Sequence, residues 1–421
     1  MMKMVPNWSG LDSDLLSEIA DRICLRDFIV FGRVCRSWRS VASPENFTKS
    51  TKVPWLMLDQ DKDDRSRRRK FFNLSEDVIY NINLPKPPRK IRSFISDIEK
   101  LNPPRKFFLN SKIKEERYFL SSKGWLLIVE YETQLILLNP FSLSRIDLPH
   151  PFPLSKDYPI DKNNTVIEPY IMNFALSSSP SSSPDFTTMI IYRLNKKGRA
   201  RLAFWKNGDR DWTDIDLMFS SEFVDMTYHN GRYYAAYLID IRNDAAHPID
   251  YQYGYVIHEI DIRNSASVSI RTKSFTNPSL KNFFRFPFWI VGSSRVLMMV
   301  VWISESNWEI RTGRQVYLRN IYTHVSPIIV EEVDFQKGES KEVKDLGDEA
   351  LFLGFKSSYL ADVSKELRFK SNHIYFVDNF QVNWQYENKG VGVYNIVSTK
   401  PLFSKGDCGY RCSSQWIEPR P

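Results

Sequence analysis

The first fifty residues carry apolar side chains at helical spacing. From Ser13 onward apolar residues recur every three or four positions and form one stripe, at Leu15, Leu16, Ile19 and Ile23. Asp12 to Asp14 open this run with oxygen acceptors, which cap the free N–H groups at a helix start. A second helical run begins at Asp27 and is ended by Ser43-Pro44. The pattern predicts two or three short helices.

Beyond Pro54 the apolar period changes from that of helices to that of strands. Short apolar or alternating runs follow one another and are separated by turn residues. Asn230-Gly231 is a strong hairpin signal, and Lys197-Gly198 and Asn207-Gly208 are weaker ones. The strands predicted from these runs are 125–130, 135–138, 188–194, 201–205, 223–228, 232–239, 256–262, 296–303, 315–320, 328–335, 373–378 and 391–396.

This succession of hairpins predicts an all-β body of about 365 residues. A sandwich of that length would be unusual, whereas a propeller of six or seven four-stranded blades needs about that many residues and has no long exposed edge. We expect a closed ring whose first strand, near Trp55 to Leu58, meets the last, near Val391 to Ile396. The predicted fold class is α+β multidomain, with three short helices in residues 5–50, the propeller in residues 54–400 and a tail in residues 401–421.

The helical segment resembles the F-box motif of plant F-box proteins. The resemblance rests on Trp8-Ser9-Gly10-Leu11, Asp14-Leu15-Leu16, Ile19-Ala20 and, most specifically, Val34-Cys35-Arg36-Ser37-Trp38-Arg39-Ser40. Asp12 stands where the family usually has proline. An aspartate can cap the helix whose start a proline would otherwise pre-set.

Segments of the β body resemble the kelch-like domain that follows the F-box in one plant family. These segments are Pro54 to Leu58, Ser121 to Leu126, Leu137 to Pro140, Leu346 to Gly354 and Asn372 to Phe376. With the helices, the resemblance covers nearly the whole chain, from Trp8 to about Ile396. Two stretches depart from the family: a basic insertion from Lys90 to Arg117, and the Ser/Pro-rich run Ser177 to Pro184, which we interpret as a flexible connection.

The resemblance implies a substrate-recognition subunit of an SCF-type (Skp, cullin, F-box) ubiquitin ligase. In such proteins the helical motif docks a Skp-type adaptor, and through it a cullin, while the propeller holds the protein to be ubiquitinated. The chain would then be a receptor and not an enzyme. The residues that match adaptor-facing or supporting positions are Leu11, Leu15, Leu16, Ile19, Val34, Cys35 and Trp38, whereas Ile23 and Phe31 are expected to pack the helices together.

The net charge of +8 is concentrated in one stretch. Residues 61–117 hold sixteen Lys and Arg against nine Asp and Glu, a net of +7. The densest cluster, typical of a nuclear localisation signal or of a patch for an acidic partner, is Arg65, Arg67, Arg68, Arg69 and Lys70. The alternative is a solvated hairpin loop. Nucleic acid is not favoured as a partner, because the cluster follows acidic residues and lacks aromatic side chains to stack on bases.

The side chains that carry catalysis or metal binding form no recognised constellation. The six histidines lack zinc-ligand spacing, and Cys408 and Cys412 supply only two ligands. Asp348-Glu349 fits a turn before a strand better than an acid/base pair. Core packing also explains Trp289, Trp302, Trp308 and Trp384 better than a sugar-binding face does. No catalytic residue, metal or cofactor is predicted, and the alternatives are a propeller enzyme, a sugar-binding protein or a basic nucleic-acid-associated regulator.

The expected compartment is the nucleus, the cytoplasm or both. Four cysteines in 421 residues are too few for a disulfide framework, which favours a reducing environment. The longest clean apolar run, 296–303, is far shorter than a membrane span, and Met1 to Gly10 lacks the apolar core of a secretion signal. We therefore expect no membrane partner.

Overall fold

The computed structural model describes most of the helical segment and of the β body. The described residues are 8–43, 46–47, 53–58, 68–85, 118–130, 134–149, 170–193, 199–219, 224–240, 252–264, 267–281, 288–293, 295–302, 308–311, 314–317, 328–354, 357–377, 391–397, 400–403 and 415–420. Within these ranges no helix is long and apolar enough to cross a membrane.

The N-terminal segment forms a small helical unit, as the spacing predicts. It contains the 3₁₀ turn η1 (Trp8–Gly10) and the helices α1 (Ser13–Ala20), α2 (Leu25–Phe31) and α3 (Arg36–Val41). Asp12 is the N-cap of α1, and its Oδ1 accepts a hydrogen bond from the Asp14 N–H at 2.9 Å. The aspartate therefore supplies the helix start that proline gives in the related motif.

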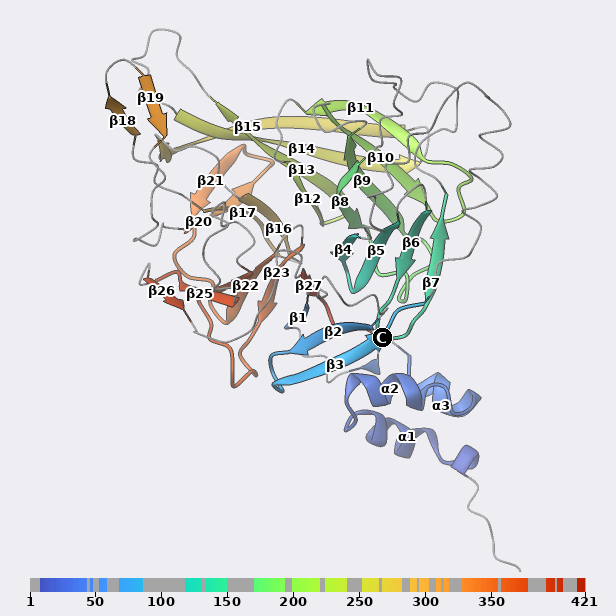
Figure 1. The fold of residues 1–421 in the computed structure, drawn as a ribbon. Helices are drawn as coiled ribbons and strands as arrows, with labels where there is room; N and C mark the ends of the chain where they lie inside the picture. The colour runs from blue at the N-terminus through green and yellow to red at the C-terminus, as the bar shows by residue number, and fades with distance from the viewer. Residues whose placement is uncertain are drawn as a thin grey trace, which may run out of the picture.

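The described residues of the β body form six blades around a central axis (Figure 1). Blade 1 contains β27 (Gln415–Ile417), β1 (Trp55–Met57), β2 (Arg68–Asn73) and β3 (Val78–Asn83). Blade 2 contains β4 (Tyr118–Ser122), β5 (Trp125–Glu130), β6 (Gln134–Leu138) and β7 (Arg145–Leu148). Blade 3 contains β8 (Tyr170–Leu176), β9 (Thr187–Arg193), β10 (Ala200–Lys206) and β11 (Thr213–Phe219).

The other three blades are longer or less regular. Blade 4 contains β12 (Val224–His229), β13 (Arg232–Asp240), β14 (Gln252–Asn264) and β15 (Ser267–Lys281). Blade 5 contains β16 (Phe288–Gly292), β17 (Leu297–Trp302), β20 (Ile328–Asp334) and β21 (Glu339–Glu342), with the hairpin β18 (Trp308–Arg311) and β19 (Arg314–Tyr317) between β17 and β20 in sequence. Blade 6 contains β23 (Ser357–Asp362), β22 (Glu349–Gly354), β24 (His373–Val377), β25 (Val391–Asn395) and β26 (Lys400–Phe403), in that order across the sheet.

The innermost strands of the six blades form a closed ring. They are β4, β8, β12, β16, β23 and β27, and each contacts the next, with β27 contacting β4. In this ring an innermost strand has a sheet partner on one side only, so its other edge presents backbone groups that need hydrogen bonds from elsewhere.

Polar side chains supply these bonds where two blades meet. Three of them accept a backbone N–H from the next blade: Ser122 Oγ from Leu176 (3.1 Å), Asp225 Oδ2 from Ile290 (2.9 Å) and Ser357 Oγ from Trp416 (3.1 Å). At the other joints a side chain donates: Asn173 Nδ2 to Asp225 Oδ1, Trp289 Nε1 to Gly354 O, and Gln415 Nε2 to Phe119 O. Every joint of the ring therefore has at least one specific hydrogen bond.

The strand that closes the ring differs from the predicted one. β1 pairs with β27, with Leu56 opposite Trp416, whereas β25 (Val391–Asn395) pairs with β24 and β26. The predicted boundary at residue 400 was therefore wrong, because β26 and β27 belong to the propeller and residues 401–421 are not merely a tail. Trp416 and Ile417 are fully buried, which explains why so short a strand is ordered.

The strongest turn signal, Asn230-Gly231, is confirmed, whereas Lys197-Gly198 lies outside the described residues. Asn230 and Gly231 both have positive φ, 44° and 82°, and join β12 to β13 as a two-residue hairpin needs. The run Ser177 to Pro184, in contrast, was wrongly interpreted as a flexible connection. Ser179 is buried and accepts a hydrogen bond from Trp125 Nε1 at 3.2 Å, and Ser177 Oγ accepts one from the Thr187 N–H at 2.8 Å.

Trp416 gives the first testable prediction, because it anchors the closing strand. Its ring packs edge-on against Phe352 at 5.3 Å, and its Nε1 donates to Leu353 O at 3.1 Å. Trp416→Ala should lower the free energy of unfolding by about 3–5 kcal/mol in urea denaturation. Trp8→Ala is the control, because Trp8 is 62% exposed and its loss should change stability by at most about 0.5 kcal/mol. Equal stability of the two variants would contradict closure by β27.

His258 gives the second prediction, on pH. The side chain is buried between blade 3 and blade 4, where it contacts the rings of Phe219 and Tyr237 and bonds Thr272 Oγ1 through Nδ1 at 2.8 Å. Burial lowers the pKa of His258 to about 4 from 6.5. The unfolded chain therefore binds a proton that the folded chain excludes, and stability falls as the pH drops from 6.5 towards 4.

At pH 5 this effect of His258 amounts to about 2 kcal/mol. His258→Gln removes the titrating group, so the variant should lose about that much less stability than the wild type between pH 7.5 and pH 5. Urea unfolding curves of both proteins at the two pH values measure the difference. Identical losses would show that His258 titrates normally in the folded chain.

Candidate functional site

The helical unit has its own core and, on another side, an exposed apolar face. Leu16, Ala20, Leu25, Phe28, Phe31, Val41 and Phe47 are buried together in that core. Trp8, Leu15, Ile19 and Val34 are exposed at 62%, 51%, 40% and 55%, and they come from η1, α1 and the turn before α3. We call these four side chains the exposed helical face. Large apolar side chains exposed together on one small unit are typical of a protein interface.

The seven residues predicted to bind an adaptor separate into three groups. Leu15, Ile19 and Val34 are exposed, whereas Leu11, Cys35 and Trp38 are half-buried. Leu16 is only 1% exposed and packs in the helical core, so of the two predicted roles, adaptor-facing or supporting, its place fits the supporting one. The prediction that Phe31 packs the helices is confirmed, and Ile23 is half-buried against the same core. Trp8 belongs to the F-box-like motif and is exposed, but the predicted adaptor-binding set did not include it.

The half-buried residues hold the exposed ones in place. Trp38 Nε1 donates to Trp8 O at 3.0 Å, and Ser37 Oγ donates to Ser9 O at the same distance. The Trp38 ring also packs on Phe31, with centroids 4.4 Å apart. Cys35 Sγ lies 3.1 Å from Ser37 Oγ, a contact that lowers the pKa of the thiol. Helix α3 thus fixes the turn that carries Trp8, and these residues support the face more than they form it.

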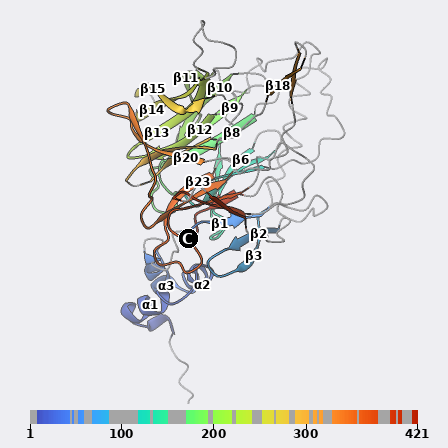
Figure 2. The same cartoon turned by 90° about the vertical axis from the view of Figure 1, so that its left-hand side faces the viewer.

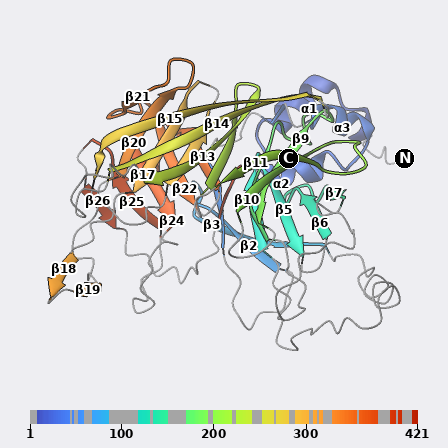
Figure 3. The same ribbon diagram turned by 90° about the horizontal axis from the view of Figure 1, so that it is seen from above.

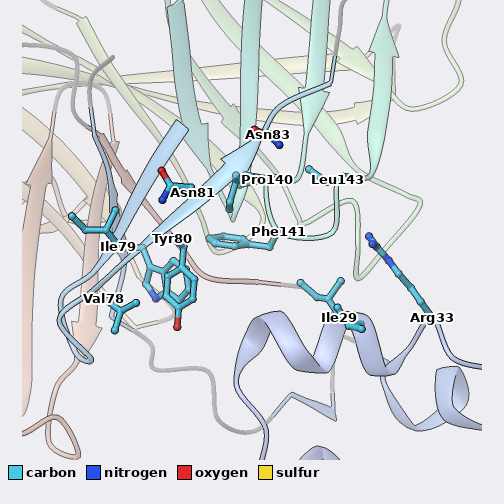
Figure 4. Close-up of a pocket in the computed structure, with 13 residues that line it drawn as sticks. Ile29, Arg33, Val78, Ile79, Tyr80, Asn81, Asn83, Pro140, Phe141 and Leu143 are labelled. Carbon is cyan, nitrogen blue, oxygen red and sulfur yellow. The ribbon is translucent and has the colours of Figure 1, made fainter. Parts of the chain in front are cut away.

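One turn of blade 2 joins the helices to the propeller. Phe141, in the turn between β6 and β7, packs against both the helical core and the core of blades 1 and 2. Its ring meets Trp55 edge-on at 5.0 Å, and next to it Arg33 Nη2 donates to Ser142 O at 2.7 Å (Figure 4). The helices lie beside the first blade in Figure 1 and in the turned view of Figure 2.

Asn139 holds that turn and the end of the closing strand together. It is fully buried, and its Oδ1 accepts the N–H groups of Phe141 and Ser142 at 2.9 and 3.0 Å. Its Nδ2 donates to Arg420 O at 3.1 Å. In Figure 3, accordingly, the C-terminal end lies next to the helices. The junction therefore depends on the same strand that closes the ring.

The comparison with protein families decides the identity of the two units. The F-box domain matches residues 8–50, and the KIB1-4 β-propeller family matches residues 71–395. The chain is an F-box protein of the KIB1-4 β-propeller family.

Other plant F-box proteins are similar to this F-box protein along its length. It is 22% identical to the Arabidopsis thaliana F-box protein At5g25290 over 95% of this chain and 93% of the relative, and 22% identical to F-box protein At2g17036 over 94% and 89%. The A. thaliana F-box/kelch-repeat protein At1g57790 is 24% identical over 53% of this chain and 50% of its own. Another A. thaliana F-box protein, 28% identical, aligns over 35% of this chain and only 34% of its own length.

Solved structures are much less similar. A Synechocystis apocarotenoid oxygenase mutant matches 86% of this F-box protein and 78% of its own chain, with a TM-score of 0.34 and 9% identity. The N-terminal domain of Nup159 matches 79% and 72%, with a TM-score of 0.24 and 11% identity. Neither likeness bears on function.

The basic cluster of this F-box protein lies partly on a strand. Arg65 and Arg67 lie outside the described residues, and so does the insertion from Lys90 to Arg117. Arg68, Arg69 and Lys70 belong to β2, where the Arg69 guanidinium lies over the Phe119 ring at 4.9 Å. Arg68 and Lys70 are exposed. The interpretation of the whole cluster as a hairpin loop was therefore wrong for its second half.

The side chains considered for catalysis or for sugar binding have structural roles where they are described. Glu349 pairs with Arg295 at 2.6 Å, and Asp348 lies in the turn before β22. Trp289 is buried, and Trp302 packs edge-on against Phe376. The side chains of Trp308, Trp384, Cys408 and Cys412 lie outside the described set. Among the described residues, no group of three or more His, Cys, Asp or Glu could hold a metal ion.

Proposed function

We propose that this F-box protein is the substrate-recognition subunit of an SCF-type E3 ubiquitin ligase. F-box domains generally bind Skp-type adaptors, and the adaptor in turn would connect this chain to a cullin. The observation that carries the proposal is the exposed helical face of the matched F-box. Its four apolar side chains lie on η1, α1 and the turn before α3, while the junction with the propeller uses α2 and the β6–β7 turn.

Burial of the exposed helical face gives an adaptor complex its driving force. Full burial of a Leu, Ile or Val side chain contributes about 1.5–3 kcal/mol relative to exposure. Leu15, Ile19 and Val34 are each 40–55% exposed, so each has a substantial part of that energy left for a partner. Leu16 contributes indirectly, because it supports α1 from inside.

The mechanism that follows is one of proximity. A receptor that holds a target protein beside a ubiquitin-charged enzyme raises the effective concentration of the target's lysines, and its own residues make or break no bond. Phe141 and Arg33 fix the helices against blades 1 and 2, so the adaptor and a target on the propeller would keep a set separation. We accordingly propose a non-catalytic role for this chain.

A matched pair of valines tests adaptor binding. Val34 is 55% exposed on the exposed helical face, and Val30 is 53% exposed on the side of α2 that faces the propeller. Val34→Asp should weaken binding to a purified Skp-type adaptor at least about tenfold in calorimetry, because it places a charge in an apolar contact. Val30→Asp carries the same chemical change and should bind the adaptor like the wild type. An unchanged affinity of folded Val34→Asp would overturn the assignment of the face.

We further propose that the protein acts in the nucleus as well as the cytoplasm and that the basic cluster directs nuclear entry. The test replaces Arg65, Arg67, Arg68 and Lys70 by Gln and leaves Arg69 in place, because Arg69 packs on Phe119. The nuclear fraction of a fluorescent fusion in plant cells should fall. The control removes four exposed lysines elsewhere, Lys341, Lys344, Lys365 and Lys370. Equal distributions of the two variants would refute a directing role of the cluster.

A further inference from the structure

A groove separates the F-box helices from blade 1. Its volume is about 590 Å³, within the usual range of binding sites. Ile29 and Val30 of α2 line one side and β3 lines the other, with Phe141 between them (Figure 4). Neither the family motif nor the predicted adaptor-binding set includes this groove.

The strand on one side presents its edge to the groove. All six residues of β3, from Val78 to Asn83, line the groove, although successive side chains of a strand point to opposite faces. Such a continuous run means that the strand's edge borders the space, together with the face of blade 1 that carries Tyr80 and Trp55. β3 is the outermost strand of blade 1 and pairs with β2 alone among the described strands. Within the described part of the chain, its outer edge therefore offers backbone donors and acceptors to another chain.

The groove is also apolar enough to hold side chains. Val78, Ile79, Val30 and Leu143 are 41–53% exposed, and all four line it. Trp55 also lines the groove, and its ring is stacked on Tyr80 with ring centroids 4.8 Å apart. A peptide that added a strand to β3 would gain backbone hydrogen bonds along the edge and bury these side chains at the same time.

The two ends of the groove differ in charge. Arg33 is the one charged side chain among the lining residues, and it lies near Leu143 at one end (Figure 4). At the other end Tyr80 donates from its hydroxyl to Glu76 Oε2 at 2.9 Å. Burial, this hydrogen bond and the nearby carboxylates of Glu76 and Asp27 raise the pKa of Tyr80 to about 12. An occupant that carries an acidic residue towards Arg33 and a basic residue towards Glu76 would complement both ends.

We propose that this groove binds an extended segment of a partner protein, which adds a strand to β3 and places an acidic residue against Arg33. The apolar side chains of the segment pack against Ile29, Val30 and Phe141. None of the four side chains of the exposed helical face lines the groove, so this binding does not depend on whether the helices hold an adaptor.

A phage-displayed library of random octapeptides tests the proposal on the full chain. Enriched peptides should alternate apolar and polar residues and carry Asp or Glu near one end. Their affinity for Val30→Asp should fall at least about tenfold, whereas Val34→Asp should bind them like the wild type. No enrichment, or enrichment that Val30→Asp leaves unchanged, would overturn the proposal. Adaptor binding by Val34→Asp is measured in a separate experiment. Failure of the adaptor assignment can therefore be told apart from failure of the peptide-binding groove.

Backbone methylation then tests strand addition itself. An enriched peptide is made with N-methyl groups on its odd residues or on its even residues, which blocks the N–H groups along one edge or the other. One pattern should abolish binding and the other should preserve it, because only one edge pairs with β3. Equal effects of the two patterns would exclude a strand.

A charge reversal at Arg33 and a measurement of the oligomeric state complete the test. Arg33→Glu should shift enriched peptides from acidic to basic residues at that end, while Arg36→Glu on α3, outside the groove, should not. A second copy of this chain could also occupy the groove, because it carries the same strand edge. Light scattering of the full chain tests for such a dimer. A dimer that Val30→Asp converts to monomer would overturn a partner segment in favour of self-association.

Discussion

The ring of innermost strands is the constraint on which the rest of the structure depends. Each of these strands has one edge without a sheet partner, and at every joint of the ring a polar side chain makes a hydrogen bond between the two neighbouring blades. Asp225 serves two joints at once, since its two oxygens accept from Asn173 and from the Ile290 N–H. Burial makes these hydrogen bonds costly to lose, because a buried N–H group without its acceptor would have no other partner. The ring therefore forms as a unit once its last strand is in place.

That last strand also sets the geometry of the functional surfaces. The Trp416 N–H is held by Ser357, and a few residues later Arg420 O is held by Asn139. Asn139 in turn shapes the turn that carries Phe141 into the helical core. Closure of the propeller is thereby connected to the position of the F-box, to the exposed helical face and to the groove beside α2.

The parts of this architecture that depend on local sequence were predictable. Asn230-Gly231 specifies its own turn, and short continuous apolar runs such as 125–130 specify their strands. The closing strand was not predictable. Its three residues, Gln415 to Ile417, are too few to show a periodicity, and burial in the ring holds them in place. Leu15 and Leu16 are adjacent, and their spacing does not tell which points inward. The groove forms only where four segments that are separate in sequence meet, so no motif indicated it.

The account assigns different surfaces to different partners: the exposed helical face to an adaptor, and the propeller with its groove to other proteins. Hydrogen exchange of the full chain, with and without a purified Skp-type adaptor, tests this division most directly. The account predicts slower exchange in η1, α1 and the turn before α3, and unchanged exchange in blades 3 to 5. Protection confined to the propeller, with the helices exchanging as in the free chain, would contradict it.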